Sequence, residues 1–246
     1  MQWRSLIDSC YQHARKACLD LDGAVMPERC AFCGTRSHAS ERGLCAGCRR
    51  DLPWLEYACK RCAEPLPAAM PGGVFCGACQ NRPSPVSITV APLLYEFPVD
   101  AGLKALKFRR KLHYAPMFAG LLLQALGQSY DEFDAVLPVP LHWRRLASRG
   151  FNQATEIGAP LARTLGRPLL RNVIRHRKTA SQTGLSARHR ERNLRHAFKV
   201  KGAVTARHVL IVDDVVTTGA TTRHLAAELL RKGADKVSVA AVARAT

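Results

Sequence analysis

Eight cysteines between positions 30 and 79 constrain the fold of this chain more than any other feature. They form four CxxC pairs: Cys30/Cys33, Cys45/Cys48, Cys59/Cys62 and Cys76/Cys79. The surrounding segment is rich in turn residues and lacks a periodic apolar pattern, so it cannot bury an apolar core of its own. Each CxxC turn can direct two sulfurs at one point, and two such turns give the tetrahedral four-thiolate site that zinc prefers. We therefore expect two structural zinc ions.

Other roles of CxxC pairs fit this segment poorly. A redox CxxC normally occurs once, at a helix start within an α/β domain, and the spacings match neither common ferredoxin pattern. The first twenty residues lack the apolar core of a secretory signal, and no apolar stretch reaches the ~18–20 residues that span a bilayer. We expect a cytoplasmic protein with reduced thiols and no transmembrane segment. The spacing leaves open whether consecutive pairs share an ion or interleave.

The composition changes after the last cysteine pair. The run NRPSPVS at 81–87 has the proline and serine content of a linker. We expect an N-terminal helix over 1–25, a double zinc ribbon over 26–82 and an α/β domain over 83–246. Apolar patterns predict strands near 87–95, 135–140, 169–175, 208–212 and 236–243, and helices near 99–108, 115–126, 152–165 and 218–232. This alternation predicts a mostly parallel sheet with flanking helices, whose ligands bind at the carboxyl ends of the strands.

The most specific chemistry lies in HVLIVDDVVTTGATT, residues 208–222. An apolar strand leads into Asp213 and Asp214, then into a loop of small and hydroxyl residues, then into a helix. Free amides at a helix N-terminus bind phosphate, and the threonine hydroxyls add donors. Two carboxylates beside a phosphate pocket require a sugar diol or a divalent cation between them and the anion. The combination predicts that this segment binds a ribose 5-phosphate unit. Either the ribose hydroxyls donate hydrogen bonds to the aspartates, or a Mg2+ ion lies between the aspartates and the ligand.

Two other interpretations of this segment are weaker. Helix capping needs one Asp or Thr, not two aspartates and three threonines, and the carboxylates of a receiver-type acidic pocket are expected on different strands. The motifs GxxxxGK[ST] and GxGxxG are both absent, which argues against a nucleotide triphosphatase or a dinucleotide site.

The segment VLIVDDVVTTGAT resembles the phosphoribosyl-pyrophosphate signature of type I phosphoribosyltransferases. With the CxxC pairs before it and LPVPLHWRRLASRGFNQA (137–154) between, the chain is similar to the ComF/GntX family over about residues 26–246. The resemblance implies a type I phosphoribosyltransferase-like fold that binds phosphoribosyl pyrophosphate with Mg2+. It places the ribose hydroxyls on Asp213 and Asp214, which would be the catalytic pair, and the pyrophosphate at the loop after Pro140. It assigns the 5-phosphate to Thr217, Thr218, Gly219, Ala220 and Thr221.

The resemblance also implies a biological setting. Members of the family are associated with natural competence, so we expect a link to DNA uptake or nucleotide metabolism, with other DNA-uptake proteins as candidate partners. If the chain is an enzyme, it is a glycosyltransferase whose phosphoribosyl acceptor the resemblance does not name. The alternative is a non-catalytic competence factor that binds single-stranded DNA and retains a regulatory or vestigial sugar-phosphate site.

Positive charge is concentrated in one part of the chain. The sequence has 37 Lys and Arg against 19 Asp and Glu, a net charge of +18, and residues 142–199 supply 14 basic and 2 acidic residues of these. A few arginines could neutralise a pyrophosphate leaving group, whereas a long basic track favours nucleic acid. Both interpretations stay open for the candidate phosphate-binding residues Arg144, Arg145, Arg149, Arg188 and Arg192.

Overall fold

The computed structural model describes residues 29–37, 42–68, 74–127, 132–176 and 197–246. They fall into two compact units, Met1–Asp51 and Leu52–Thr246, and each is described by itself. The helix expected over 1–25 lies outside the described residues. Within the described part of the chain, no helix has the length and apolar character needed to cross a membrane.

The first unit holds the first two CxxC pairs and one short helix, α2 (Ala46–Arg50). This helix has five residues and buries none of its side chains. An isolated helix of that length is unstable in water. The local fold therefore depends on groups other than an apolar core, in agreement with the expectation of a bound metal.

The second unit contains the other two CxxC pairs, the four-residue helix α3 (Gly77–Gln80) and all the described strands. The domain boundary expected at residue 82 stays a prediction from sequence composition, and in space the second cysteine group shares one compact unit with the sheet. The remaining helices of this unit are α4 (Val99–Arg109), α5 (Tyr114–Leu126), α6 (Trp143–Arg149), α7 (Gln153–Leu165) and α9 (Ala220–Arg231). Its strands are β1 (Thr89–Val90), β2 (Leu93–Leu94), β3 (Ala135–Pro138), β4 (Val173–Arg175), β5 (Phe198–Val200), β6 (His208–Val216) and β7 (Lys236–Arg244).

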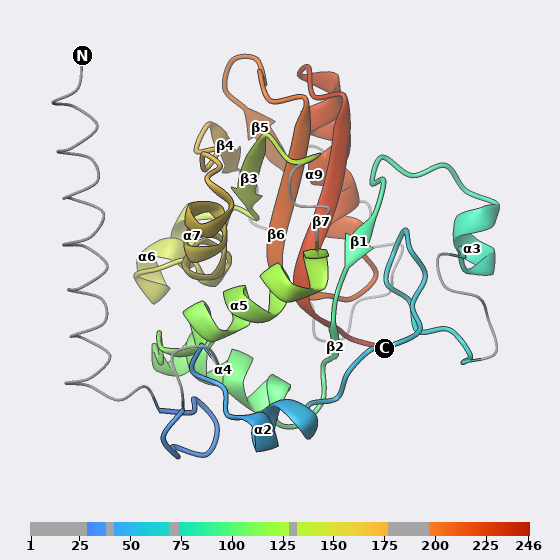
Figure 1. Cartoon of the computed structure of the whole chain (residues 1–246). Helices are drawn as coiled ribbons and strands as arrows, with labels where there is room; N and C mark the ends of the chain where they lie inside the picture. Colours follow the sequence, from blue (N-terminus) through green and yellow to red (C-terminus); the bar gives the residue numbers. More distant parts are fainter. Residues whose placement is uncertain (1–28, 38–41, 69–73, 128–131, 177–196) are drawn as a thin grey trace, which may run out of the picture. The chain divides into compact units, whose positions relative to one another are not determined.

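The main sheet is parallel, as the strand and helix alternation predicts. Its order is β1-β7-β6-β3, and β2 also pairs with β7, whereas β4 and β5 form a separate antiparallel pair. The two long strands β6 and β7 run through the middle of the sheet (Figure 1). Leu137 of β3 is in register with Ile211 of β6, which fixes the carboxyl ends of these strands at one edge.

Helices cover both faces of the sheet, so most residues of the central strands β6 and β7 are buried. Helices α5 and α7 pack together on one face, and α9 packs against β5 and β7 on the other (Figure 1). Gly158 lets α7 approach β3 closely, since an added Cβ would lie 3.1 Å from Cγ of Pro138. Phe118, Leu121 and Leu122 of α5 are fully buried, and each such burial contributes about 1.5–3 kcal/mol.

The structure refines several expected elements. Strand β6 extends to Val216, four residues past the expected end, because β7 is equally long and pairs with it as far as Arg244. The strand expected over 87–95 is divided into β1 and β2 around Pro92, which has no amide to donate to a ladder. Helix α6 was not expected. Its N-cap is His142, whose Nδ1 accepts a hydrogen bond from the amide of Arg144 at 3.2 Å.

Candidate functional site

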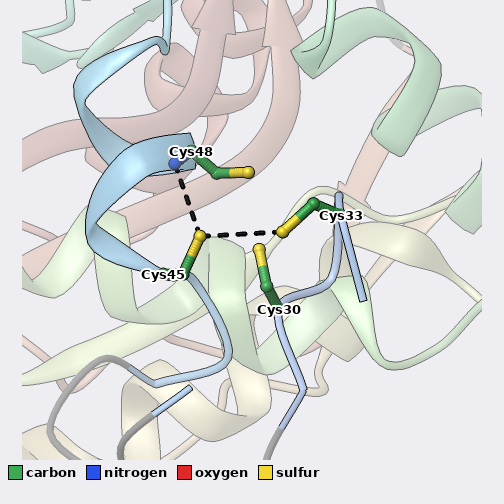
Figure 2. A group of neighbouring side chains, drawn as sticks. All are labelled: Cys30, Cys33, Cys45 and Cys48. Atoms are coloured by element: carbon green, nitrogen blue, oxygen red, sulfur yellow. Dashed lines mark hydrogen bonds between the residues drawn. The ribbon is translucent and has the colours of Figure 1, made fainter. Parts of the chain in front are cut away.

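The first cysteine group forms a closed four-sulfur cluster. The Sγ atoms of Cys30, Cys33, Cys45 and Cys48 all lie within 4.8 Å of one another, and Cys33 Sγ lies 3.7 Å from Cys45 Sγ (Figure 2). A tetrahedral zinc ion with Zn–S bonds of about 2.3 Å places its sulfurs about 3.8 Å apart. The cluster therefore fits a structural zinc ion.

Local hydrogen bonds favour the thiolate form of Cys33 in this cluster. The Thr35 hydroxyl lies 3.3 Å from Cys33 Sγ, and hydrogen bonding from Thr35 lowers the pKa of Cys33 to about 6. The amide of Cys48 donates to Cys45 Sγ at 3.5 Å (Figure 2). Gly34 adopts φ +73°, a left-handed conformation that suits glycine in the tight turn after Cys33.

The second cysteine group repeats this arrangement. The Sγ atoms of Cys59, Cys62, Cys76 and Cys79 lie within 4.8 Å of one another, Cys62 Sγ lies 3.7 Å from Cys76 Sγ, and the amide of Cys76 donates to Cys59 Sγ at 3.2 Å. Burial raises the pKa of Cys59, but backbone hydrogen bonds outweigh it and bring the pKa to about 7. Consecutive CxxC pairs thus share each site, which decides the pairing that the spacing had left open.

The second cysteine group is joined to the sheet by hydrogen bonds. In the turn between Cys59 and Cys62, the carbonyl of Lys60 accepts from the amide of Thr89 at 3.0 Å, and the carbonyl of Arg61 accepts from its hydroxyl at 2.7 Å. Thr89 belongs to β1, which pairs with β7. The second zinc site is therefore part of the same packed unit as the sheet.

The acidic pair lies near the carboxyl end of β6. Asp214 is buried, Asp213 is partly exposed, and the amide of Asp214 donates to Asp213 Oδ1 at 2.9 Å. Burial, followed by the negative charge of Asp214, raises the pKa of Asp213 well above its ordinary value. Two adjacent carboxyl groups with few solvent contacts favour a shared proton or a bound cation. The pair is therefore suited to accept hydrogen bonds or coordinate a divalent ion.

Basic side chains from three other elements face this pair. Lys107 of α4 places its Nζ 3.8 Å from Asp214 Oδ2. Burial lowers the pKa of Arg149 on α6, and the charge of Asp214 opposes this shift. The pKa of Arg175 on β4 is lowered first by burial and then by the positive charge of Arg145. The negative charge of Asp213 opposes this shift. Cations from segments far apart in the chain therefore lie close enough to the acidic pair to interact with its charge.

The threonine loop connects the acidic pair to α9. Gly219 is the N-cap of α9 with φ +68°, and the amide of Ala220 donates to Thr218 Oγ1 at 3.4 Å. Thr217 and Thr218 are exposed, Gly219 and Thr221 are partly exposed, and Ala220 is buried. Asp214 and Thr217 both line a cavity of about 610 Å³. The structure therefore places part of the expected phosphate loop beside an acidic residue in one cavity.

The structure places three of the five candidate arginines. Arg149 lies on α6 close enough to Asp214 to interact with its charge, and Arg145 on the same helix interacts with Arg149 and Arg175. Arg144 stacks over Trp143, with its Cζ 5.1 Å from the ring centroid. Arg188 and Arg192 lie outside the described residues. The sequence analysis assigned neither Lys107 nor Arg175 to the acidic pair. Only the sheet packing brings them to the aspartates, so no local pattern marks them.

Both the cysteine-rich segment and the chain over most of its length are similar to known proteins. Residues 21–80 match the double zinc ribbon domain family. Over 221 residues, the chain is 38% identical to the DNA utilization protein YhgH of Salmonella typhimurium, with 87% of this chain and 96% of the relative covered. The chain belongs to the family of this protein. The resemblance to the ComF/GntX family and the double zinc ribbon are confirmed.

The chain is also similar to two competence proteins. Competence protein F of Haemophilus influenzae is 31% identical over 226 residues, with 88% of this chain and 97% of the relative covered. Competence protein ComFC of Bacillus subtilis is 30% identical over 143 residues, with 56% of each chain covered. A purine phosphoribosyltransferase from Pyrococcus horikoshii shows 20% identity and a TM-score of 0.33 over 52% of this chain and 70% of the other. That TM-score is too low to support a statement about this chain.

Proposed function

We propose that this family member binds phosphoribosyl pyrophosphate with Mg2+ at the carboxyl edge of β6 and acts in DNA utilisation as a phosphoribosyltransferase-like protein. One observation carries the proposal: the acidic pair Asp213 and Asp214 leads directly into a loop that ends at a left-handed glycine and the start of α9. The amides at the start of a helix bind phosphate. The names of the relatives, which refer to DNA utilization and competence, support the biological setting.

The donor set suits magnesium shared with a ligand. Magnesium sites in proteins often use one or two carboxylates together with substrate phosphates, and Asp213 and Asp214 provide two carboxylates beside the loop. When bound, the ion would neutralise phosphate charge at the acidic pair. Asp213 and Asp214 orient the ribose, and Thr217, Thr218, Gly219, Ala220 and Thr221 hold the 5-phosphate.

The basic residues of α6 and β4 fit the pyrophosphate group. In a transfer reaction, the bond between C1 of the ribose and the pyrophosphate oxygen breaks while an acceptor bonds to C1, and pyrophosphate leaves with the electron pair. Arg145, Arg149 and Arg175 would stabilise the charge that develops on this group. Arg149 Nη1 donates to Gln153 Oε1 at 2.5 Å, which orients its guanidinium on the first turn of α7.

Calorimetry with phosphoribosyl pyrophosphate and Mg2+ tests the proposal. The wild-type protein should bind, and the double variant Asp213→Asn/Asp214→Asn should bind at least tenfold more weakly. Asp235→Asn, which removes an exposed carboxylate paired with Arg207, should match the wild type. Equal binding by the double variant and the wild type, or none by the wild type, would refute the proposed site. Release of pyrophosphate with one member of a panel of bases would make the protein an enzyme and identify its acceptor.

A second candidate function, binding of single-stranded DNA, has its own supporting observation. Phe108 and Trp143 are 69% and 63% exposed, and cationic groups lie over both rings. Arg149 Cζ lies 5.5 Å from the Phe108 ring centroid and Arg144 Cζ lies 5.1 Å from that of Trp143. Exposed aromatic rings beside arginines stack with the bases of single strands. Phe108 was not among the residues that the sequence singled out for this role.

Anisotropy with a labelled oligothymidylate tests this second function. Phe108→Ala and Trp143→Ala should each weaken binding, and affinity should fall steeply as salt increases. Phe97→Ala is the matched control, because Phe97 is 81% exposed and no cation lies over its ring among the described residues. Absent binding, salt-independent binding, or equal losses for all three variants would contradict it.

A further inference from the structure

A second cavity lies on the other side of the threonine loop, against the second zinc ribbon. Its volume is about 650 Å³, within the ~300–1,000 Å³ typical of small-molecule sites. Cys79 and Arg82 line it from the ribbon, and Thr218, Gly219 and Arg223 line it from the loop and α9. Both walls belong to the unit Leu52–Thr246. The cavity is therefore a feature of one packed unit.

The threonine loop separates this cavity from the one that contains the acidic pair. Asp214 and Thr217 line the first cavity, whereas Thr218 and Gly219 line the second. No aspartate is among the residues that line the second cavity. A ligand in the second cavity would thus contact Thr218 and Gly219, which the proposed function assigns to the 5-phosphate, but neither Asp213 nor Asp214. Substitution of the aspartates therefore distinguishes the two ligands.

The charge of the second cavity favours an anion. Four arginines line it, against a single glutamate, Glu64. A zinc ion with four thiolates would add two net negative charges, and the arginines still outweigh the sum. Arg61 and Arg244 already have protein partners: Arg61 Nη1 donates to the Cys79 carbonyl at 2.6 Å, and Arg244 pairs with Glu64.

Two arginines are available to a ligand. The side chain of Arg82 is exposed and forms no hydrogen bond or ion pair with another described residue. Arg223 Nη1 donates to the Thr218 carbonyl at 2.5 Å. Because a carbonyl has no net charge, this hydrogen bond leaves the positive charge of Arg223 without a compensating negative charge. A guanidinium presents several donors in a planar fork that matches phosphate oxygens. The free donors of the cavity therefore suit a phosphate group.

Part of the remaining lining is apolar. Pro83, Val86 and Val216 contribute hydrophobic surface beside the arginines. Sites for small ligands combine such surface with a few placed polar groups. We propose that this cavity binds the phosphate group of a nucleotide, with the base against the apolar wall and the second zinc ribbon as one side of the site. This goes beyond the proposed function, because it assigns a ligand to the ribbon.

The test is a titration of AMP into the full-length, zinc-loaded protein, followed by calorimetry. Arg82→Glu should weaken AMP binding at least tenfold, and Ala78→Trp, which places an indole at the ribbon wall of the cavity, should do the same. Arg163→Glu is the matched control, since Arg163 is exposed on α7 and lines neither cavity. Asp213→Asn/Asp214→Asn should leave AMP binding unchanged.

Competition identifies the source of the phosphate. Displacement of AMP by 5′-phosphorylated oligothymidylate, but not by the unphosphorylated strand, would indicate a strand end, and displacement by neither would indicate a free nucleotide. No AMP binding by the wild type, or wild-type affinity for AMP in Arg82→Glu and Ala78→Trp, would overturn the proposal. Loss of AMP binding in the Asp213→Asn/Asp214→Asn variant would do so too, because AMP would then occupy the acidic site. These outcomes can be interpreted even if the wild-type protein does not bind phosphoribosyl pyrophosphate, because AMP binding is measured separately.

Discussion

Arg244 at the end of β7 pairs with Glu64 of the second zinc ribbon, a residue 180 positions earlier in the chain. Arg244 is buried, and its Nη1 also donates to the carbonyl of Val216 at 3.2 Å. The backbone carbonyl of Glu64 accepts a hydrogen bond from the amide of Cys59 at 2.8 Å. Because Val216 directly precedes the threonine loop, one guanidinium connects a zinc ligand's backbone to the candidate phosphate site.

Breaking this pair should destabilise the second unit. Glu64→Gln leaves the buried guanidinium of Arg244 without its carboxylate. We expect a loss of about 2 kcal/mol in the free energy of unfolding, below the ~3–5 kcal/mol of a fully buried pair, because the Glu64 side chain is 46% exposed. Urea unfolding of the zinc-loaded protein measures it. Glu132→Gln, which breaks the exposed pair with Lys236, should change stability little, and an equal effect of both would contradict the prediction.

The two zinc sites should differ in their importance for the sheet. Cys62→Ala and Cys33→Ala each remove one ligand at the same position of a cysteine knuckle, and each should lower the zinc content from two ions per chain toward one. Only Cys62→Ala should lower the melting temperature of the α/β unit, because the second group belongs to the same compact unit as the sheet. In that unit, Thr89 of β1 donates to the turn between Cys59 and Cys62, and Glu64 pairs with Arg244. Zinc assay and circular dichroism measure both effects. Equal melting temperatures for the two variants would refute this asymmetry.

The acidic pair should make stability depend on pH. The pKa of Asp213 is raised above its ordinary value of 3.8 by burial and by Asp214, so the folded state holds its proton more tightly than the unfolded state. This contribution is present below the ordinary pKa and is lost as pH rises through the raised one. Asp213→Asn should remove this part of the pH dependence in urea unfolding curves measured across that range. A variant with the wild-type pH profile would show that Asp213 does not titrate in this way.

Gly219 should be needed for the geometry of the threonine loop. Gly219→Ala places a Cβ in a left-handed conformation and 3.3 Å from Arg223 Nη1, a backbone cost of about 1–2 kcal/mol. Gly202→Ala is the control, since Gly202 has φ +76° but its added Cβ would meet no atom within 4 Å. Both variants should lose similar stability, and only Gly219→Ala should bind phosphoribosyl pyrophosphate more weakly. Unchanged binding would argue against a role of this loop.

Local patterns predicted most of the fold. The buried runs that became β3, β6 and β7 and the amphipathic segments that became α4, α5, α7 and α9 are recognisable because burial and periodicity are properties of a short stretch of chain. The short helix α6 escaped prediction, because its seven residues bury no side chain. The extension of β6 past Val212 escaped it too, because this extension depends on the length of its neighbour β7.

The amino-acid sequence by itself determined the chemistry present: eight thiols in four pairs, two adjacent carboxylates, a loop of threonines and a basic segment. Only the tertiary structure decided which thiols share an ion, that Lys107 and Arg175 face the aspartates, and that the second ribbon lies against the threonine loop. The physical reason is the range of the interactions. Turn and strand preferences act over a few residues, whereas the pairing of Arg244 with Glu64 requires the whole sheet to form before the two side chains can meet.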